Sequence, residues 1–334
     1  MQDKHKKLLS RSGFYAGAVF VVLTVSFLLM SLPMGGGEHP GVTFSRTYAQ
    51  ELGLEPQELL VNILDDLQVR RFRIPAYWSL IESQPDVWTY DWLDSDLDNI
   101  AARGGTVTLA IGEKLPRWPE CWIPDWASQM PQEEREQAVL RYLEKTVNRY
   151  KNHPAIEMWQ VENEPGFPFG TCPPVRREFI DQELTLVKSL DQTRPIATTD
   201  SGELSMWKLG RKVDLLGVSV YRVVIGPLGI FRYWFMPPQF YLRKGQAVQR
   251  LWKFEDFYIS EFQMEPWTKR PSLTVTPIDE QMQTFDIQQM RENIDFARSS
   301  GISKIDYWGV EWWYWMKKVH NQPIFWEQAK TLFP

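Results

Sequence analysis

Strand-like and helix-like segments alternate along this chain from about Gly41 to the C-terminus, and this alternation limits the possible folds sharply. Eight short apolar runs have the length and composition of buried strands. They are residues 42–45, 72–75, 107–111, 156–161, 196–199, 215–221, 257–259 and 305–308. Apolar residues at helical spacing separate most of these runs, as in Leu60, Ile63, Leu64 and Leu67. Strands that alternate with helices usually form a parallel sheet.

The number of strands favours a closed sheet over an open one. Eight strands with intervening helices, and no Gly-rich phosphate-binding loop, indicate a single (β/α)8 barrel over residues 41–334. The chain has 334 residues and a net charge of −5, which gives no indication of a nucleic-acid partner. We therefore expect one α/β TIM-barrel domain and no contact with nucleic acid.

The N-terminus differs in composition from the rest. Residues 1–12 are basic, residues 13–32 carry no charge, and residues 33–40 include a run of three glycines. A helix over 13–32, at about 1.5 Å per residue, spans roughly the hydrocarbon core of a bilayer. We expect a cytoplasmic N-terminus, a transmembrane signal anchor, a linker at 33–40, and a single-pass membrane protein whose barrel lies outside the cytoplasm. The alternative is a cleaved signal peptide and a secreted protein, since Gly35 and Gly37 resemble a small-residue cleavage site.

The cysteines and histidines do not indicate a metal site. Cys121 and Cys172 both fall in expected loops, where they either pair outside the cytoplasm or remain two unrelated thiols. The four histidines are scattered without ligand spacing, so we expect no metal and no other cofactor.

One insertion interrupts the alternation after the sixth strand. It is rich in aromatic residues between Phe231 and Tyr241. Long loops after barrel strands build the substrate rim. The alternatives are a local hydrophobic mini-core and contact with the bilayer.

Polar residues stand at the ends of the expected strands, where a barrel gathers its functional side chains. In chain order they are Arg73, Asn163, Glu164, Asp200, Tyr221, Glu261 and Trp308. Ionised glutamate is almost never fully buried unless it is paired. Glu164 and Glu261, each just after an apolar run, are therefore candidates for chemistry.

Two carboxyl groups about 5 Å apart are what cleavage of a glycosidic bond with retention requires. One must be protonated and the other ionised, so their surroundings must differ. Arg73 is expected to keep Glu261 ionised and Tyr221 to donate a hydrogen bond to it. Asn163 is expected to bind a sugar hydroxyl.

Further candidates for substrate binding are aromatic or acidic. Trp308 offers a flat floor for a sugar ring, and the 16 tryptophans of the chain agree with a carbohydrate ligand or with ordinary core packing. Trp78 follows the second strand, and Glu311 lies in the loop after the eighth. Glu113 and Lys114, after the third strand, either bind substrate hydroxyls or belong to a solvated loop.

These motifs resemble clan A of the glycoside hydrolases, a group of retaining barrel enzymes. The resemblance rests on Asn163-Glu164-Pro165 after a fourth strand and Glu261 on a seventh. It implies that Glu164 is the acid/base and Glu261 the nucleophile. Arg73-Ile74-Pro75, Tyr221 and Trp308 resemble the family 5 cellulase and mannanase group more specifically.

The sequence also departs from family 5. Gly112-Glu113 and Ser219 stand where that group usually has histidines, and Glu162 stands where tryptophan commonly precedes the Asn-Glu pair. We therefore expect a divergent branch or a neighbouring family. Strand parity alone leaves Glu162 as an alternative acid, because bulges shift parity; the clan pattern favours Glu164.

We expect a membrane-tethered retaining β-glycosidase that acts on a glycoside, an oligosaccharide or a polysaccharide. Transglycosylation by the same residues is a related alternative. A catalytically silent carbohydrate-binding or envelope-scaffold protein is the alternative from another class, since a fold does not establish activity.

Overall fold

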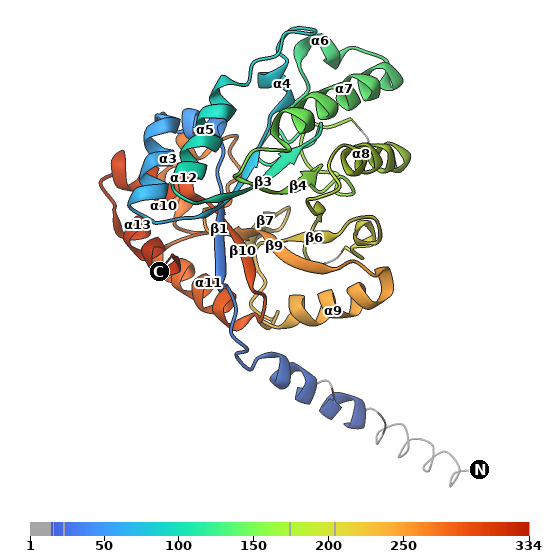
Figure 1. The fold of residues 1–334 in the computed structure, drawn as a ribbon. Coiled ribbons are helices and arrows are strands. Elements are labelled where there is room, and N and C mark those ends of the chain that lie inside the picture. Colours follow the sequence, from blue (N-terminus) through green and yellow to red (C-terminus); the bar gives the residue numbers. More distant parts are fainter. Residues whose placement is uncertain (1–14, 16, 23, 174, 204, 334) are drawn as a thin grey trace, which may run out of the picture.

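The computed structural model describes residues 15, 17–22, 24–173, 175–203 and 205–333. Eight strands close into a barrel in which every pairing is parallel, as expected (Figure 1). The barrel strands are β1 (His39–Thr43), β2 (Arg71–Pro75), β3 (Thr106–Ile111), β4 (Ile156–Val161), β5 (Ile196–Asp200), β6 (Leu215–Val220), β9 (Asp256–Gln263) and β10 (Lys304–Trp308). They follow one another around the barrel in chain order, and β10 closes it against β1.

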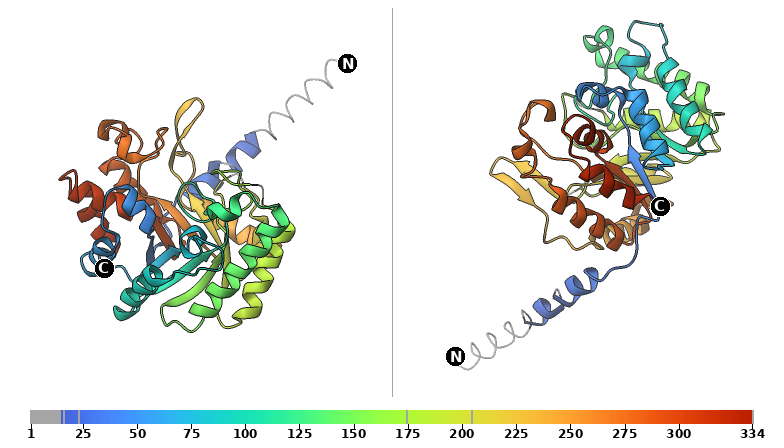
Figure 2. Two further views of the ribbon diagram at one scale, coloured as in Figure 1. Left: turned by 90° about the horizontal axis from the view of Figure 1, so that it is seen from above. Right: turned by 90° about the vertical axis from the view of Figure 1, so that its left-hand side faces the viewer.

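Helices form an outer layer around this barrel (Figure 2). The α-helices are α2 (Arg46–Glu51), α3 (Pro56–Asp65), α4 (Trp78–Ile81), α5 (Asp91–Ala102), α6 (Asp125–Ser128), α7 (Gln132–Tyr150), α8 (Arg177–Leu190), α9 (Phe240–Trp252), α10 (Ile278–Gln281), α11 (Ile287–Ser299), α12 (Val310–Lys318) and α13 (Ile324–Ala329). Within the described residues, the short 3-10 helices are η1 (Lys208–Lys212), η2 (Leu273–Val275) and η3 (Lys330–Leu332). Among the described residues between β5 and β6, only η1 replaces the usual crossover helix.

The apolar runs form strands because the barrel buries them on both faces. All residues of β2, β5 and β6 are buried, including the polar side chains of Arg71, Arg73 and Asp200, so none of these strands has an exposed face. Thr43 at the end of β1 pairs with both Arg73 and Trp308, which brings these two residues to the same level of the barrel. The strand ends therefore converge, as the site prediction requires.

The insertion after β6 is a hairpin followed by an aromatic turn. Strands β7 (Val223–Gly226) and β8 (Gly229–Arg232) pair in antiparallel fashion and project from the barrel (Figure 2). Phe231, Tyr233 and Phe235 contact one another, yet Phe231 and Phe235 remain exposed. The three rings therefore pack against one another, as in a local hydrophobic mini-core, but two of them remain exposed to solvent.

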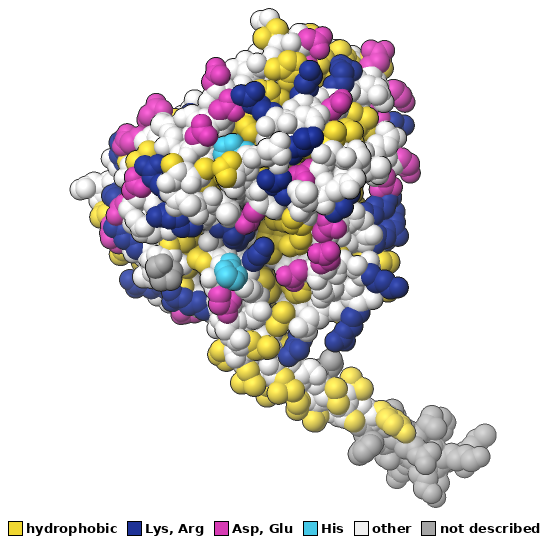
Figure 3. Space-filling model, in the orientation of Figure 1, with side chains coloured by type: hydrophobic (Ala, Val, Ile, Leu, Met, Phe, Trp, Pro, Cys, Tyr) yellow, Lys and Arg dark blue, Asp and Glu magenta, His cyan; other side chains and the backbone are white. Residues whose placement is uncertain are grey.

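The N-terminal segment stands apart from the barrel. Residues 17–22 and 24–30 are helical, and Figure 3 shows their apolar side chains on the surface. Within the described part of the chain, no helix is both long and apolar enough to cross a membrane. The predicted basic segment 1–12 lies outside the described residues, as do positions 13, 14, 16 and 23 of the predicted anchor.

The predicted linker at 33–40 is shorter than expected. Strand β1 begins at His39, and the Gly37 amide already donates to the Ile302 carbonyl at 2.8 Å. The end of this segment is thus part of the barrel.

A disulfide joins Cys121 to Cys172, which confirms the paired alternative. The bond connects the loop after β3 with the loop after β4, and the two Cα atoms lie 5.2 Å apart. Both loops are on the edge of the barrel where the strand ends converge.

Candidate active site

Arg73, in the middle of β2, is the centre of the site. Its buried guanidinium group donates to Glu261 Oε1 at 2.9 Å, to Asn163 Oδ1 at 2.5 Å and to Gln160 Oε1 at 2.7 Å. These partners come from β9, from the residues after β4, and from β4 itself. Because a guanidinium stays charged, Arg73 places a permanent positive charge beside Glu261 and links three strand ends.

Glu261 has a donor on each carboxyl oxygen. Oε1 accepts from Arg73, and Oε2 accepts from the Tyr221 hydroxyl at 2.8 Å. The pairing between β6 and β9 shifts between Val218–Ile259 and Ser219–Glu261, so β9 has a bulge just before this glutamate. Bulges re-aim side chains beside active sites. A positive charge and a hydroxyl donor are the surroundings that an attacking carboxylate requires.

Glu164 lies just after β4 in different surroundings. Its amide donates to Thr199 Oγ1 at 2.8 Å, and its Oε1 accepts from the Ser219 hydroxyl at 2.5 Å. Burial and the negative charge of Glu261 raise the pKa of Glu164 to about 8. A carboxyl group with this pKa is protonated at neutral pH, as a general acid must be.

Glu162, the alternative acid, points elsewhere. Its two carboxyl oxygens accept the amides of Glu113 and Lys114, each at 2.7 Å. Burial and the charge of Glu113 act to raise its pKa, which reaches about 7, and its carboxyl neighbour is Glu183 of α8. Glu162 therefore closes the turn after β3, and Glu164 is the residue beside Glu261.

Trp308 and Glu311 belong to a buried network at the edge of this site. The Arg117 guanidinium lies between the rings of Tyr48 and Trp308, 3.8 and 3.9 Å from their centroids. It forms ion pairs with Glu265 and Glu311, and Trp308 Nε1 donates to Glu265 at 2.8 Å. Trp308 is thus covered by Arg117, and Glu311 is fully buried. Neither offers the open surface that was predicted for substrate binding.

Trp78 does not join the site. It is fully buried in α4, its ring contacts Trp126 and Tyr142, and its Nε1 donates to Glu82 at 2.8 Å. The prediction that Trp78 binds substrate is not supported by this packing.

Glu113 and Lys114 also have structural partners. Glu113 pairs with Arg135 of α7 at 3.0 Å. Lys114 Nζ donates to the carbonyls of Glu164 and Phe167 at 3.0 and 2.7 Å. Lys114 thereby supports the turn that follows the acid/base candidate.

Glu120 is a site residue that the sequence analysis missed. It is buried, and the Asn163 Nδ2 group lies 3.4 Å from its Oε2. Burial and the charges of Glu261 and Glu164 raise its pKa well above the usual value, so three carboxyl groups share this site. Its only sequence signal was a polar position in the loop after the third strand.

Among the described residues, no group of three or more His, Cys, Asp or Glu side chains is arranged to hold a metal ion. A closed parallel barrel with glutamates after its fourth and in its seventh barrel strand is the arrangement expected from the resemblance to clan A of the glycoside hydrolases.

Comparisons with known proteins support this class. The family model described as "Glycosyl hydrolases family 2, TIM barrel domain" matches residues 102–225, a range that includes Glu164 and ends before Glu261. The chain is 26% identical over 114 residues to the β-galactosidase BgaB of Geobacillus sp. strain Y412MC61. It is 30% identical over 82 residues to a β-glucuronidase of Chlorocebus aethiops.

These matches are partial. They cover 28% and 25% of this chain, but only 17% and 12% of the two relatives, so the chain spans a small part of their length. Among solved structures, the β-galactosidase of the psychrophilic Marinomonas ef1 has a TM-score of 0.53 at 14% identity, over 80% of this chain and 53% of that one. That likeness shows the fold. The narrower resemblance to family 5 is not supported, because the matching family model is that of family 2.

Proposed function

We propose that this protein is a retaining β-glycosidase in which Glu164 is the acid/base and Glu261 the nucleophile. The proposal rests on the different surroundings of two glutamate side chains, Glu164 and Glu261. Arg73 and Tyr221 donate to Glu261, whereas burial and the charge of Glu261 raise the pKa of Glu164 to about 8. Opposite protonation states in one site are what the double-displacement reaction needs.

The two steps use these groups in turn. In the first, Glu261 attacks the anomeric carbon, the bond to the leaving oxygen breaks, and Glu164 gives its proton to that oxygen. In the second, ionised Glu164 takes a proton from water, the water oxygen attacks the anomeric carbon, and Glu261 is released. Arg73 and Tyr221 hold Glu261 in place through both steps.

A neutral sugar fits the described surroundings better than a uronic acid. Arg73 and Arg117 are already paired with carboxyl groups, and Lys114 donates to two carbonyls. A uronate carboxylate would need a cation free to bind it. Between the activities named for the two relatives, we therefore propose a β-galactoside rather than a β-glucuronide as the first substrate to test.

The proposed setting is a membrane surface. The uncharged segment 13–32 and its basic flank support a signal anchor with the barrel outside the cytoplasm. The disulfide between Cys121 and Cys172 agrees with a compartment outside the cytoplasm.

The test is covalent trapping followed by kinetics. A 2-fluoro β-galactoside with an activated leaving group is expected to label Glu261, as peptide mass spectrometry would show. A panel of 4-nitrophenyl β-galactoside, β-glucuronide, β-glucoside and β-xyloside then identifies the sugar. Glu261→Ala is expected to abolish turnover, by at least about 10⁴-fold for a residue that forms the covalent intermediate.

A second variant, Glu164→Ala, tests the role of Glu164 as the acid/base. It is expected to impair substrates with poor leaving groups far more than activated aryl glycosides, because only the former need a proton in the first step. Unchanged turnover in Glu261→Ala, or a label on another residue, would contradict the assignment. A protein that binds the sugars without labelling or turnover would instead be the silent carbohydrate-binding alternative.

A further inference from the structure

Four aromatic residues on three different loops form a series of ring contacts that reaches Tyr221 of the site. Trp118 comes from the loop after β3, Phe167 and Phe169 from the loop after β4, and Trp267 from the loop after β9. We call them the aromatic platform. Trp118 is 57% exposed, Phe167 42% and Phe169 36%, although side chains of this size are usually buried. Contiguous exposed apolar rings are typical of a binding surface.

The platform is continuous with the catalytic pair. The Trp267 ring meets the Tyr221 ring edge-on at 5.2 Å, and the Tyr221 hydroxyl donates to Glu261. Phe169 follows, with its centroid 6.1 Å from Trp267 and 6.2 Å from Trp118. Phe167 stacks on Phe169 at 6.0 Å. The rings thus lead outward from the nucleophile to the surface.

Covalent and polar links hold the platform in place. The Cys121–Cys172 disulfide and the bond from the Thr171 amide to the Pro119 carbonyl, at 3.1 Å, fasten the two loops together. Gly170 has a φ of +87°, and a Cβ there would lie 2.5 Å from the Cβ of Glu120, so only glycine allows the loops to approach this closely. Rings held exposed by such links are preorganised for a ligand.

One end of the platform belongs to the turn that holds the acid/base candidate Glu164. The Phe167 amide donates to the Glu164 carbonyl at 2.8 Å, and Lys114 Nζ binds the carbonyls of both residues. Phe167 therefore belongs to the same turn as the acid/base, which must face the oxygen that leaves. A group attached to that oxygen is directed toward these rings.

From this placement we infer that the aromatic platform binds the sugar ring on the leaving-group side, so that the substrate is a β-linked oligosaccharide or polysaccharide. This inference rests on the proposed glycosidase activity. The rings offer flat faces to the C–H faces of a sugar, and their continuity with Tyr221 favours a sugar over a lipid or a protein.

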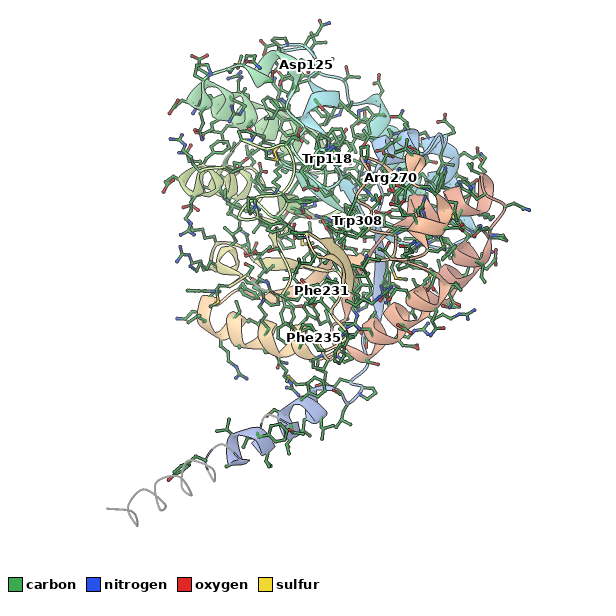
Figure 4. All side chains as sticks on the ribbon, turned by 180° about the vertical axis from the view of Figure 1, so that it is seen from behind. Trp118, Asp125, Phe231, Phe235, Arg270 and Trp308 are labelled. Atoms are coloured by element: carbon green, nitrogen blue, oxygen red, sulfur yellow. A yellow bond between two sulfur atoms is a disulfide. The ribbon has the colours of Figure 1, made fainter. Side chains whose placement is uncertain are left out.

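Trp234, in the aromatic turn that follows the β7–β8 hairpin, provides a matched control. Trp234 is 79% exposed, and its ring contacts Phe235 rather than any residue of the platform. Figure 4 shows Trp118 and Trp308 near the middle of the molecule, with Phe231 and Phe235 lower, toward the N-terminal segment. A general effect of removing an exposed aromatic ring would appear at Trp234 as well.

The experiment compares two substrates with the same glycone, chosen by the aryl-glycoside panel. For a galactoside they are β-D-galactosyl fluoride, whose leaving group has no ring, and β-1,4-galactobiose. Trp118→Ala and Phe167→Ala are each expected to lower kcat/KM for galactobiose by about 10-fold, the effect of one lost ring contact, and to leave the fluoride within about 2-fold. Trp234→Ala is expected to change neither.

The possible outcomes either support or overturn the proposed sugar-binding subsite. Selective loss on the disaccharide in the two platform variants supports the subsite. Equal loss on both substrates, no loss on either, or the same selective loss in Trp234→Ala overturns it. Failure of the proposed function is a separate result, because the unaltered protein would then not hydrolyse galactosyl fluoride or any other glycosyl fluoride.

Discussion

Glu164 and Glu261 have the same side chain, and their neighbours give them different roles. Arg73 and Tyr221 hold the oxygens of Glu261, and Ser219 is the hydroxyl donor on Glu164. The pKa of Glu164 is the balance of opposing effects: burial and Glu261 raise it, while the Ser219 hydrogen bond and Lys114 lower it. Small changes around these residues should therefore appear in the pH dependence of the reaction.

Ser219→Ala tests this balance. The Ser219 hydroxyl stabilises the ionised form of Glu164, so its removal should raise the pKa of that carboxyl group further. Since Glu164 must be protonated for the first step, activity is lost as pH rises through its pKa. The basic limb of kcat/KM should therefore move to higher pH by about one pH unit, the effect of one hydrogen bond to a charged group.

Ser260→Ala is the control, because its buried hydroxyl has no hydrogen-bond partner among the described residues. It should leave the basic limb in place. A basic limb that stays unchanged in Ser219→Ala would mean that another group sets it.

Individual site residues could be predicted only where a strand end brings them together. Arg73, Asn163, Glu164, Tyr221 and Glu261 do lie in one cluster, as their positions after apolar runs suggested. Glu120 was missed because a loop of unknown path places it there, in a left-handed conformation with φ +73°. Trp78 and Glu311 were assigned to the site because they follow strands, but their side chains are fully buried.

At the level of elements, the strands were easier to predict than their connections. Each expected strand overlaps an observed one, with ends that differ by at most four residues, because a strand buried on both faces is a short, mostly apolar run. The connections vary more: η1 replaces a helix after β5, and a hairpin follows β6. Their shapes depend on distant partners, as when Arg117 joins the loop after β3 to Glu265 and Glu311.

Helix α8 and the residue that follows strand β4 carry a buried pair of carboxyl groups, and this pair predicts how stability depends on pH. Glu183 is fully buried, neither of its oxygens has a donor among the described residues, and burial and the charge of Glu162 raise its pKa. The pKa of Glu162 is raised to about 7. The folded protein therefore holds protons that the unfolded chain releases above about pH 4.5. Its free energy of unfolding should fall as pH rises toward 7.

Glu183→Gln should reduce this dependence. The amide carries no charge at any pH, so the variant should gain thermal stability relative to the unaltered protein at pH 8 and differ little at pH 5. Melting temperatures at the two pH values provide the measurement. Glu178→Gln, on the exposed side of the same helix, is the control and should change neither value. Equal effects of Glu183→Gln at both pH values would contradict the explanation.

On the scale of the whole molecule, the N-terminal segment and the barrel are separate structures with a narrow junction. The Gln239 amide donates to the Met30 carbonyl at 3.3 Å, and its side chain donates to the Leu32 carbonyl. The barrel itself begins at His39. Activity and location should therefore be separable.

Deleting residues 1–29 tests the proposed anchor. The shortened protein keeps the Met30 and Leu32 carbonyls, so it should fold and retain kcat/KM within about twofold, since surface changes away from a site have small effects. It should also move from the membrane fraction to the soluble fraction on cell fractionation. If the protein expressed from the complete sequence is found in the soluble fraction with its N-terminus beyond residue 32, a cleaved signal peptide would be supported instead.

The amino-acid pattern was enough to predict the barrel and to place Glu164 and Glu261 near the ends of two of its strands, because a buried barrel strand is a short, mostly apolar run in the sequence. It left the pairing of Cys121 with Cys172 and the choice between Glu162 and Glu164 open. In the folded protein the loops after β3 and β4 approach each other, and Cys121 pairs with Cys172. Glu162 lies against the turn after β3, where its carboxyl oxygens accept two backbone amides. The platform and the third carboxyl group of Glu120 also emerged only in three dimensions, since their residues come from loops that are distant in the chain.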